Sequence, residues 1–406
     1  MLRRLPLLLA LLLLTGCGGS PSEQRGRPAD VDGDGHDDLV LYVDLWYRVP
    51  AAKRFLVVVP GSAKGVDASR KVVIPQERFH SWLLGLGIRA DLDGDGFGDV
   101  LNYGWPGDEQ ERTGTYVYWG GPHGIAADAV PTQLSAANGP GSSAANGPGS
   151  SSARCVAGDF DGDGAADVAM ADGGGLLVMY GPFDRDAEPA RRTVQRSPTG
   201  GEFWRMTADR IEGRRATGLV VNSADDGEQT TGWLLGAGPD GPAKQARKLN
   251  QGLASAFGDF DGDGRRDVAL GDNGSRNTEA PGDVRAGVAG TLTVYYGDGE
   301  VTTFHGMKGL LVSGDFDGDG RDDLAFGGES DLVAGYARQP IWTLWGGPGG
   351  LRRGNGIAGM ARGTPLASGD YDGDGDDELV LGDAVGPTFH VLVSDGRKVL
   401  TRFDLR

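Results

Sequence analysis

One short stretch, repeated with variation along the chain, constrains the fold more than any other feature. Its fifth copy begins at Gly314 and reads Gly-Asp-Phe-Asp-Gly-Asp-Gly-Arg-Asp-Asp-Leu. Counted from Asp315, acidic residues occupy positions 1, 3, 5 and 9. Calcium takes about six to eight oxygen ligands at once, which alternating aspartates in one tight turn can supply. Gly320 at position 6 permits the sharp turn, and position 7 is expected to offer its backbone carbonyl.

Six copies of this loop share the same spacing. One acidic, glycine-rich turn is often only a solvated hairpin, but six matched clusters of bare carboxylates would be costly to hold together. The sequence therefore predicts about six Ca²⁺ ions, one in each loop. The predicted ligands, at positions 1, 3, 5, 7 and 9, are Asp30, Asp32, Asp34, His36 and Asp38; Asp91, Asp93, Asp95, Phe97 and Asp99; Asp159, Asp161, Asp163, Ala165 and Asp167; Asp259, Asp261, Asp263, Arg265 and Asp267; Asp315, Asp317, Asp319, Arg321 and Asp323; and Asp370, Asp372, Asp374, Asp376 and Glu378.

Three other interpretations of the glycine-rich segments are set aside. An EF-hand needs Glu at position 12, where this chain has Leu41, Asn102, Met170, Leu270, Phe326 and Leu381. Mg²⁺ is disfavoured because it keeps its waters and requires smaller octahedral sites. The segment from Gly85 to Ala90 matches the dinucleotide-binding fingerprint, but it runs into the second acidic loop and not into a helix.

The spacing of the loops reveals a seventh, degenerate repeat. Successive first aspartates lie 61, 68, 100, 56 and 55 residues apart, and Asp209 lies 50 residues from its neighbour on each side of the long gap. The segment after Asp209 has lost the second and third aspartates, so we expect it to bind no metal. The 68-residue gap contains a tandem duplication of Ser-Ala-Ala-Asn-Gly-Pro-Gly-Ser at 135–150, which is low-complexity linker.

Each repeat also carries four short apolar runs. One precedes the acidic loop, one follows it, a third often ends in an aromatic residue and glycine, as at Trp119-Gly120, and a short fourth closes the unit. The 72 glycines suit many tight turns. Four strands per 50 to 60 residues without helical periodicity predict an all-β fold, a seven-bladed β-propeller with four-stranded blades. The blades are expected to start near residues 30, 91, 159, 209, 259, 315 and 370.

These repeats resemble the FG-GAP/VCBS repeats that form the propeller of integrin α-subunits and of many exported bacterial proteins. The resemblance covers Asp30 to about Arg406. It implies that each acidic loop joins the first two strands of a blade on the lower face and binds Ca²⁺. The repeat around Asp209 departs from the pattern, and so does the first blade, which lacks a convincing first strand. Either a piece near Arg27–Ala29 or the C-terminal Val399–Leu405 is expected to complete the ring.

The N-terminus has the pattern of an export signal. Arg3 and Arg4 precede an apolar run that is too short to span a bilayer, and the run ends in Leu14-Thr15-Gly16-Cys17. This ending resembles the lipobox of bacterial lipoproteins, which implies cleavage after residue 16 and lipidation of Cys17. Gly18 follows in place of the Asp that retains many such proteins at the inner membrane. We therefore expect a tether over residues 17–28 and a location at the outer membrane or cell surface.

With Cys17 acylated, only one thiol is left, so no intramolecular disulfide is possible. Cys155 lies just before an acidic loop and is expected to be a small buried residue. Bound metal is one way in which an exported domain without disulfides gains rigidity.

The acidity of the chain is largely explained by the loops. The net charge of −18 becomes −20 when Arg3 and Arg4 are removed, leaving 37 basic against 57 acidic residues. Twenty-four carboxylates belong to the six loops, and six Ca²⁺ would bring the charge to −8. An acidic surface repels nucleic acid, so we expect no nucleic-acid partner, and we expect a monomer.

Signatures of catalysis are sparse. The chain has no nucleophile elbow, no zinc-protease motif and no Walker A segment, so we expect a protein that is not an enzyme. The long connections between second and third strands mark the face opposite the metal loops. Exposed aromatics beside carboxylates suit a glycan or protein ligand there. The candidate ligand-binding residues are Trp46, Tyr47, Trp105, Asp108, Glu109 and Tyr336.

The sequence thus favours a non-catalytic binding or adhesion module of the cell envelope, and two alternatives stay open. One is an enzyme acting on polysaccharide, a lyase or hydrolase, through residues such as His80, Asp108 or Glu109. The other is a scaffold subunit of an envelope complex. Trp119, Trp233 and Trp345 follow the repeat pattern and are expected to pack between blades.

Overall fold

The structure is a computed structural model. It describes residues 27–44, 54–75, 79–81, 85–106, 114–134, 155–172, 175–224, 228–276, 287–328, 341–358, 360, 363–385 and 388–405. Within these ranges the regular secondary structure consists of β-strands. A search of the same residues finds no helix that is long and apolar enough to cross a membrane.

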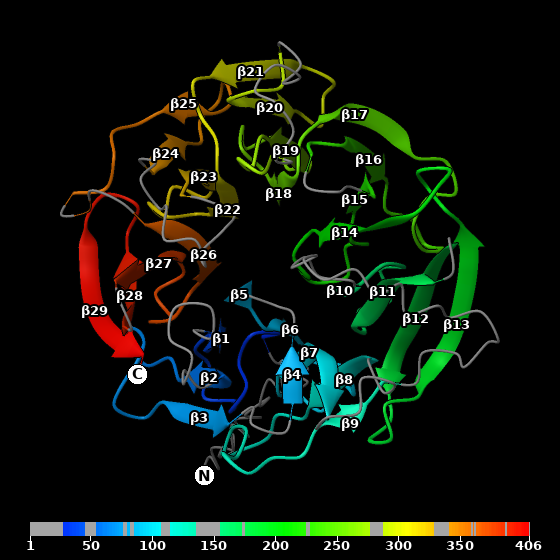
Figure 1. Ribbon diagram of the computed structural model, residues 1–406, viewed down its shortest axis with the longest axis vertical. Coiled ribbons are helices and arrows are strands. Elements are labelled where there is room, and N and C mark those ends of the chain that lie inside the picture. Colours follow the sequence, from blue (N-terminus) through cyan, green and yellow to red (C-terminus); the bar gives the residue numbers. More distant parts are fainter. Residues whose placement is uncertain are drawn as a thin grey trace, which may run out of the picture.

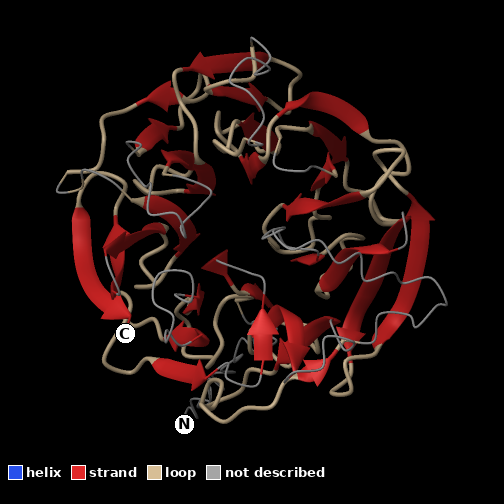
Figure 2. Cartoon of the chain, in the orientation of Figure 1, coloured by secondary structure: helices blue, strands red, loops and turns tan. Residues whose placement is uncertain are grey.

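Seven antiparallel sheets radiate from a common centre, and the chain visits them in sequence order around the ring (Figure 1). In every sheet except that of blade 1, the first strand lies nearest the centre and the last lies at the rim, and turns and loops connect them (Figure 2). The fold is therefore the all-β, seven-bladed propeller with four-stranded blades that the sequence predicted.

Five of the blades are built from four consecutive strands. Blade 3 contains β10 (Cys155–Gly158), β11 (Asp167–Asp172), β12 (Gly175–Phe183) and β13 (Pro189–Arg196). Blade 4 contains β14 (Phe203–Ala208), β15 (Leu219–Ser223), β16 (Thr231–Leu235) and β17 (Arg247–Gln251). Blade 5 contains β18 (Ala254–Gly258), β19 (Asp267–Gly271), β20 (Thr291–Tyr295) and β21 (Val301–His305). Blade 6 contains β22 (Leu310–Gly314), β23 (Asp323–Gly327), β24 (Trp342–Trp345) and β25 (Arg352–Arg353). Blade 7 contains β26 (Thr364–Gly369), β27 (Glu378–Val385), β28 (Thr388–Ser394) and β29 (Val399–Leu405).

The inner strand of blade 1 comes from a segment that interrupts the inner strand of blade 2. Blade 1 contains β1 (Leu39–Asp44), β2 (Arg54–Val59), β3 (Val72–Pro75) and, on its inner edge, β5 (Gly85–Leu86). Blade 2 contains β7 (Asp99–Pro106), β8 (Gly114–Tyr118), β9 (Thr132–Gln133) and a split inner strand, β4 (Phe79–Ser81) plus β6 (Ile88–Ala90). The segment between β4 and β6 thus leaves blade 2 and forms β5, the inner strand of blade 1.

This arrangement corrects both sequence-based expectations for ring closure. The inner strand of blade 1 is neither a piece near Arg27–Ala29 nor the C-terminal strand, because Gly85 and Leu86 pair with β1 and Val399–Leu405 forms the rim of blade 7. Gly87 marks the crossing between the two blades. A Cβ there would lie 2.6 Å from Cγ1 of Val40 and 3.0 Å from Cγ1 of Val100, so only glycine fits between them. The segment that mimics a dinucleotide fingerprint is therefore a strand crossing.

The hydrophobic core is divided among the seven blade–blade interfaces. Each of seven clusters of buried apolar side chains combines residues from two adjacent blades. One of them joins blade 7 to blade 1, for example Tyr371 and Val391 with Leu39 and Val57. Cys155 is fully buried in the cluster between blades 2 and 3, as the sequence indicated. Within the described residues blades 7 and 1 share no strand, so packing and loop contacts close the ring.

Candidate metal centres

The acidic loops lie between the first and second strands of their blades, except in blade 1, where the loop only precedes β1. Positions 4 and 6 are glycines with positive φ throughout, for example +75° at Gly33 and +93° at Gly35. Residues with a Cβ rarely adopt this conformation, so glycine is required at both positions. The two left-handed glycines coil the chain so that its backbone N–H groups point inward.

The position 1 carboxylate accepts these inward N–H groups. In blade 1, Oδ1 of Asp30 accepts from Gly33 N at 2.6 Å, and Oδ2 accepts from Gly35 N at 2.8 Å. The bond from the position 6 glycine recurs at 2.8–3.0 Å in blades 2, 3, 5 and 6. The loop is thus preformed around its first aspartate by its own backbone.

The position 9 carboxylate joins the loop to the rest of its blade. In blade 3, Oδ2 of Asp167 accepts from the position 2 nitrogen of Phe160 at 2.7 Å, and Oδ1 accepts from Gly181 N, just beyond Tyr180 on β12, at 2.9 Å. The same pair of bonds occurs in blades 1, 2, 5 and 6. The glycine that follows the third-strand aromatic in several repeats is therefore a partner of this carboxylate.

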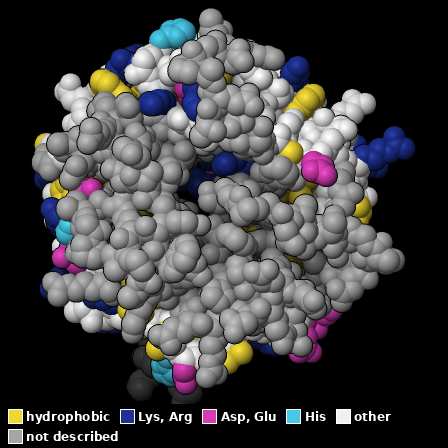
Figure 3. All heavy atoms as spheres, viewed as in Figure 1, with side chains coloured by type: hydrophobic (Ala, Val, Ile, Leu, Met, Phe, Trp, Pro, Cys, Tyr) yellow, Lys and Arg dark blue, Asp and Glu magenta, His cyan; other side chains and the backbone are white. Residues whose placement is uncertain are grey.

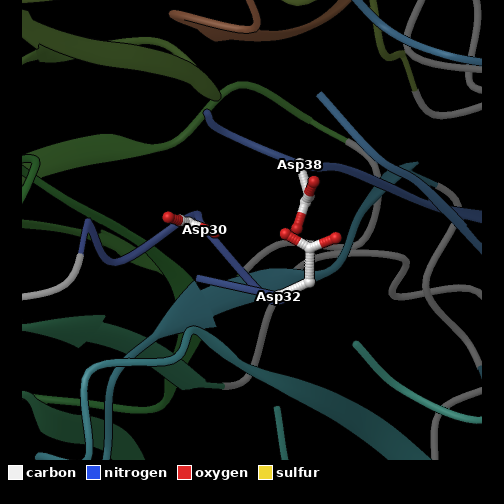
Figure 4. Close-up of side chains that lie close together, drawn as sticks. All are labelled: Asp30, Asp32 and Asp38. Atoms are coloured by element: carbon white, nitrogen blue, oxygen red, sulfur yellow. The ribbon is translucent and has the colours of Figure 1, made fainter. Parts of the chain in front are cut away.

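The carboxylates of a loop converge. In five loops, oxygens of three acidic residues lie within 4.8 Å of one another, and these sets can hold a metal ion. The sets are Asp30, Asp32 and Asp38; Asp91, Asp93 and Asp99; Asp159, Asp161 and Asp167; Asp259, Asp261 and Asp263; and Asp315, Asp317 and Asp323. Figure 4 shows the carboxylates of Asp32 and Asp38 facing each other, with Asp30 set apart from them in this view.

Several carboxylate oxygens in these loops are buried without a hydrogen-bond partner among the described residues. They are Oδ1 of Asp91, Asp159 and Asp370 at position 1, and Oδ1 of Asp317 at position 3. A buried polar atom without a partner costs about 1–3 kcal/mol, so such atoms are rare in folded proteins. A cation in each loop would satisfy all four of them, and hard oxygen donors of this kind fit calcium.

Burial raises the pKa of the position 9 carboxyls in the metal-free loops. The pKa of Asp38, Asp99, Asp167, Asp267 and Asp323 rises to about 7, mainly because burial disfavours the charged form and only partly because of neighbouring aspartates. Burial likewise raises the pKa of Glu378 to about 8. Without a cation, each loop therefore holds a carboxyl group that resists ionisation near neutral pH.

The predicted position 7 residues make a different kind of contact. Four of the six side chains lie over the position 4 glycine of the preceding loop in the ring, where an added Cβ would fall 2.1–2.7 Å from them. The pairs are Phe97 over Gly33, His36 over Gly373, Asp376 over Gly318 and Arg321 over Gly262. The pair formed by His36 and Gly373 bridges blades 1 and 7. These side chains therefore link neighbouring loops, and the proposed carbonyl ligation at position 7 stays a prediction.

Sequence reasoning missed two further loop positions. Position 2 carries an apolar residue in all six loops, each at most 2% exposed, and each contributes to the core shared with the next blade: Val31, Leu92, Phe160, Phe260, Phe316 and Tyr371. Position 8 connects loops through the backbone. Asp322 N donates to Asp259 O at 3.0 Å, and Asp37 N donates to Asp370 O at 3.1 Å. The constant apolar character of position 2 was the available sequence signal.

The degenerate loop of blade 4 holds arginine where the other loops gather carboxylates. Asp209 is buried and accepts from Arg215 Nη1 at 2.7 Å and from Arg266 through Nε and Nη2 at 2.8–3.1 Å. Burial alone would raise the pKa of Asp209, but the hydrogen bonds and charges of the two arginines lower it below its usual value. Two guanidinium groups thus neutralise this carboxylate.

The remaining candidate residues are placed only in part. Trp105 lies in β7 opposite His80 of β4 in the strand register, and their side chains are outside the described part of the structure. Cys17, Trp46, Tyr47, Asp108, Glu109 and Tyr336 lie outside the described residues. Trp119 and Trp345 are partly buried at the interfaces with blades 3 and 7, respectively.

One polar pair lies far from the metal loops in its blade. In blade 7, Nδ1 of His390 and Oδ1 of Asp404 are 2.5 Å apart on adjacent strands. Asp383 is opposite His390 on the other neighbouring strand, so the three residues form a row across the sheet. The row lies at the end of the blade opposite its acidic loop.

Comparisons with known proteins show similarity in fold alone. No family model and no curated protein matches the chain. A rhamnogalacturonan lyase from Bacillus licheniformis is 12% identical, with 91% of this chain and 71% of that chain covered and a TM-score of 0.42. A neuraminidase-like protein from a flat-faced bat isolate is 10% identical (90% and 95% covered, TM-score 0.40), and AofleA from Arthrobotrys oligospora is 9% identical (86% and 93% covered, TM-score 0.39). At these values the similarity says nothing about what this chain binds or acts on.

The raised pKa values predict how the stability of the calcium-free protein depends on pH. A position 9 carboxyl has a pKa of 3.8 in the unfolded chain and of about 7 in the folded one. The protonated form of such a group contributes stability that is complete below pH ~4 and is lost as the pH rises through about 7.

In chelator-treated protein we therefore expect the melting temperature to fall between pH 5 and pH 8, since five such aspartates must ionise inside the fold. With saturating calcium the fall should disappear, because the ion favours the ionised form. Thermal melts across this pH range, with and without calcium, measure both trends. A calcium-free melting temperature that rises with pH would contradict the prediction.

Paired substitutions in blades 2 and 4 separate metal-dependent from metal-independent stability. Asp91→Asn should lower the melting temperature in calcium by several degrees, but in chelator it should leave the protein at least as stable, because one repelling charge is gone. Asp209→Asn should destabilise the protein under both conditions by on the order of 3–5 kcal/mol, because Arg266 and Arg215 lose a buried partner. Denaturant unfolding with and without calcium provides the comparison. Equal calcium dependence in the two variants would show that blade 4 also uses metal.

Proposed function

We propose that this protein is a calcium-stabilised propeller of the FG-GAP/VCBS kind, in which about six Ca²⁺ ions occupy the acidic loops. The observation that carries the proposal is the set of buried, unpartnered carboxylate oxygens at position 1 of three loops and position 3 of a fourth, within the described residues. Calcium bound there would satisfy these oxygens and keep the position 9 carboxyls ionised. Such an ion stabilises the folded chain because the unfolded chain offers no converged ligands.

The role proposed for calcium is structural. The same loops supply the apolar residue at position 2 and the backbone contacts that join adjacent blades. An ion that fixes the loop therefore also fixes the interface between two blades. This role suits an exported chain in which Cys155 is the single cysteine after the proposed lipidation site.

The N-terminal pattern supports a lipid anchor at Cys17, with residues 18–28 as a tether that holds the propeller away from the membrane. Such a chain would be carried to the outer membrane or the cell surface. A binding surface would then face away from the attachment point or into the surrounding medium.

Substitution of Cys17 tests the anchor. In a bacterial host that processes lipoproteins, the unaltered chain should fractionate with membranes and incorporate labelled fatty acid. Cys17→Ser should incorporate none and should appear in the soluble fraction, because a single residue carries the lipid. The matched control is Cys155→Ser, which should stay membrane-bound. Membrane association of the Cys17 variant at the level of the unaltered protein would rule out this anchor.

The proposed biochemical role is that of a binding module for a glycan or protein ligand. The acidic-loop end of the propeller is occupied by contacts between loops, such as Gly98 N to Asp30 O at 2.6 Å and Asp377 N to Asp315 O at 2.8 Å. The connections between second and third strands differ widely in length and sequence from blade to blade. Variation of this kind on a constant scaffold is typical of recognition surfaces, which favours the end opposite the acidic loops.

An enzyme acting on polysaccharide is the second candidate, and the pair formed by His390 and Asp404 is the observation that favours it. A carboxylate that holds one imidazole nitrogen orients the ring so that the other nitrogen can exchange a proton with a substrate. His390 is largely buried, with a side chain 16% exposed, and it lies at the end of blade 7 where the proposed ligand surface is.

A glycan and polysaccharide array, screened with the soluble chain from Ser20 onward, distinguishes these roles. Calcium-dependent binding without cleavage is the expected result, and it would support the binding module. Cleavage products that disappear in the His390→Asn variant would establish the enzyme instead. A blank array with folded, calcium-loaded protein would contradict a glycan ligand, and copurification from envelope extracts would then identify a protein ligand or the complex that the chain helps to scaffold.

A further inference from the structure

In two acidic loops the position 3 carboxylate is contacted by an arginine from the following blade. In blade 2, Asp93 Oδ2 lies 2.6 Å from Nε of Arg185, and Asp95 Oδ2 lies 2.5 Å from its Nη2. In blade 6, Asp317 Oδ2 lies 2.7 Å from Nη2 of Arg397. Arg185 belongs to the turn between β12 and β13 of blade 3, and Arg397 belongs to the equivalent turn between β28 and β29 of blade 7. The same device thus occurs at two separate interfaces.

Each of these arginines is also fixed by an aromatic ring. The guanidinium carbon of Arg185 lies 4.9 Å from the ring centre of Trp119, and that of Arg397 lies 4.6 Å from the ring centre of Trp345. Cation–π stacking of this kind restricts the planar guanidinium to one orientation. Trp119 directly follows β8 and Trp345 ends β24, the third strands of the two blades whose loops are contacted. Loop, ring and arginine therefore form one unit across the interface.

The residue after each tryptophan contacts the position 9 carboxylate at the other end of the loop. The residue after Trp119 is Gly120, whose N–H donates to Asp99 at position 9 at 2.9 Å. The residue after Trp345 is Gly346, whose N–H donates to Asp323 at 2.7 Å. The end of the third strand therefore holds both carboxylates. It holds position 3 through the arginine stacked on the tryptophan and position 9 through the backbone N–H of the next residue.

The two oxygens of Asp317 have different surroundings. Oδ2 is paired with Arg397, whereas Oδ1 is buried and has no hydrogen-bond partner among the described residues. Oδ1 belongs to a carboxylate that converges with Asp315 and Asp323. The arginine thus holds one oxygen on the outside and leaves the other available to a cation.

We propose that Arg185 and Arg397 are positioning residues of the calcium sites in blades 2 and 6, each holding the position 3 carboxylate so that one oxygen is presented to the ion. This inference rests on the proposed calcium binding. Because each arginine comes from the following blade, the site of one blade is complete only when the next blade is docked. Calcium binding and blade docking then stabilise each other.

The arginine affects the affinity of the site for calcium in two opposing ways. Its positive charge repels the ion, but Arg185 and Arg397 have side chains 52% and 59% exposed, so water screens this repulsion. Orientation of a ligand by an outer partner changes metal affinity by about 10- to 100-fold. Orientation therefore outweighs repulsion, and loss of the arginine should weaken binding by about tenfold, the low end of that range for an exposed partner.

Hydrogen exchange of individual loops during a calcium titration tests the proposal. In purified Arg397→Ala protein, the calcium concentration that half-protects the segment 310–327 should rise about tenfold. The segment 155–172 of blade 3, on a separate part of the ring, should keep its midpoint in the same molecule and serves as an internal reference. The matched control is Arg353→Ala. Arg353 also stacks on a tryptophan, Trp342 at 4.8 Å, but it donates to His305 O and not to an acidic loop of the described structure.

The lysine variant covers the case in which Arg397→Ala does not fold. Arg397→Lys keeps the charge but loses the planar fork, so it should shift the midpoint in the same direction by a smaller factor. If the unaltered protein shows no calcium-dependent protection in any loop, the proposed calcium sites fail and the inference fails with them. If the loops of the unaltered protein respond but neither Arg397 variant moves the midpoint of segment 310–327, the calcium sites stand and the positioning role is refuted.

Discussion

The buried carboxylate at position 9 of each acidic loop is the interaction on which much of the structure depends. In five blades its two oxygens accept N–H groups from two places that are distant in sequence, the second residue of the loop and the glycine after the third strand. In blades 2, 3, 5 and 6, where the loop joins the first two strands, one side chain thereby fixes the first, second and third strands relative to one another. Charged hydrogen bonds of this kind are strong, but only while the carboxylate stays ionised. Burial disfavours the ionised form and so raises the pKa of this carboxyl group. A nearby cation would offset the free-energy cost of keeping the group ionised.

The same loops also hold neighbouring blades together, which explains how packing and loop contacts close the ring. Position 2 enters the core of the next interface, and position 8 connects to the first residue of the preceding loop. Between blades 7 and 1 these contacts are Tyr371 in the core and Asp37 N to Asp370 O. Arg89 of blade 2 adds to this seam by donating to Asp38 O and, at 3.5 Å, to Ser368 O.

The space-filling view shows basic and acidic side chains in the hollow at the centre of the ring (Figure 3).

The fold was predictable from the sequence because its signals are local and repeated. The glycines at positions 4 and 6 are required by backbone conformation. Their recurrence marks six blades, and the doubled gap with Asp209 at its midpoint marks the seventh. The inner strand of blade 1 was not predictable in this way. Gly85 and Leu86 form a strand too short for any periodic pattern, and their pairing with β1 depends on the chain crossing at Gly87. The contacts of Arg185 and Arg397 were likewise hidden, since they join residues 92 and 80 positions apart in sequence.

Blade 4 shows how a buried loop carboxylate is neutralised by arginine side chains. Its loop has lost three of the four acidic positions, yet it keeps Asp209, and Arg215 and Arg266 supply the positive charge at this carboxylate. Arg266 also reaches Asp322 of blade 6 at 2.5 Å, and Arg210 pairs with Asp322 at 3.0 Å and with Asp377 of blade 7 at 3.4 Å. Fixed guanidinium groups therefore connect blades 4 to 7 whatever the calcium concentration. The calcium ions proposed for the other loops would supply the positive charge that arginine supplies here, so under that proposal blade 4 is the part of the ring that does not respond to calcium.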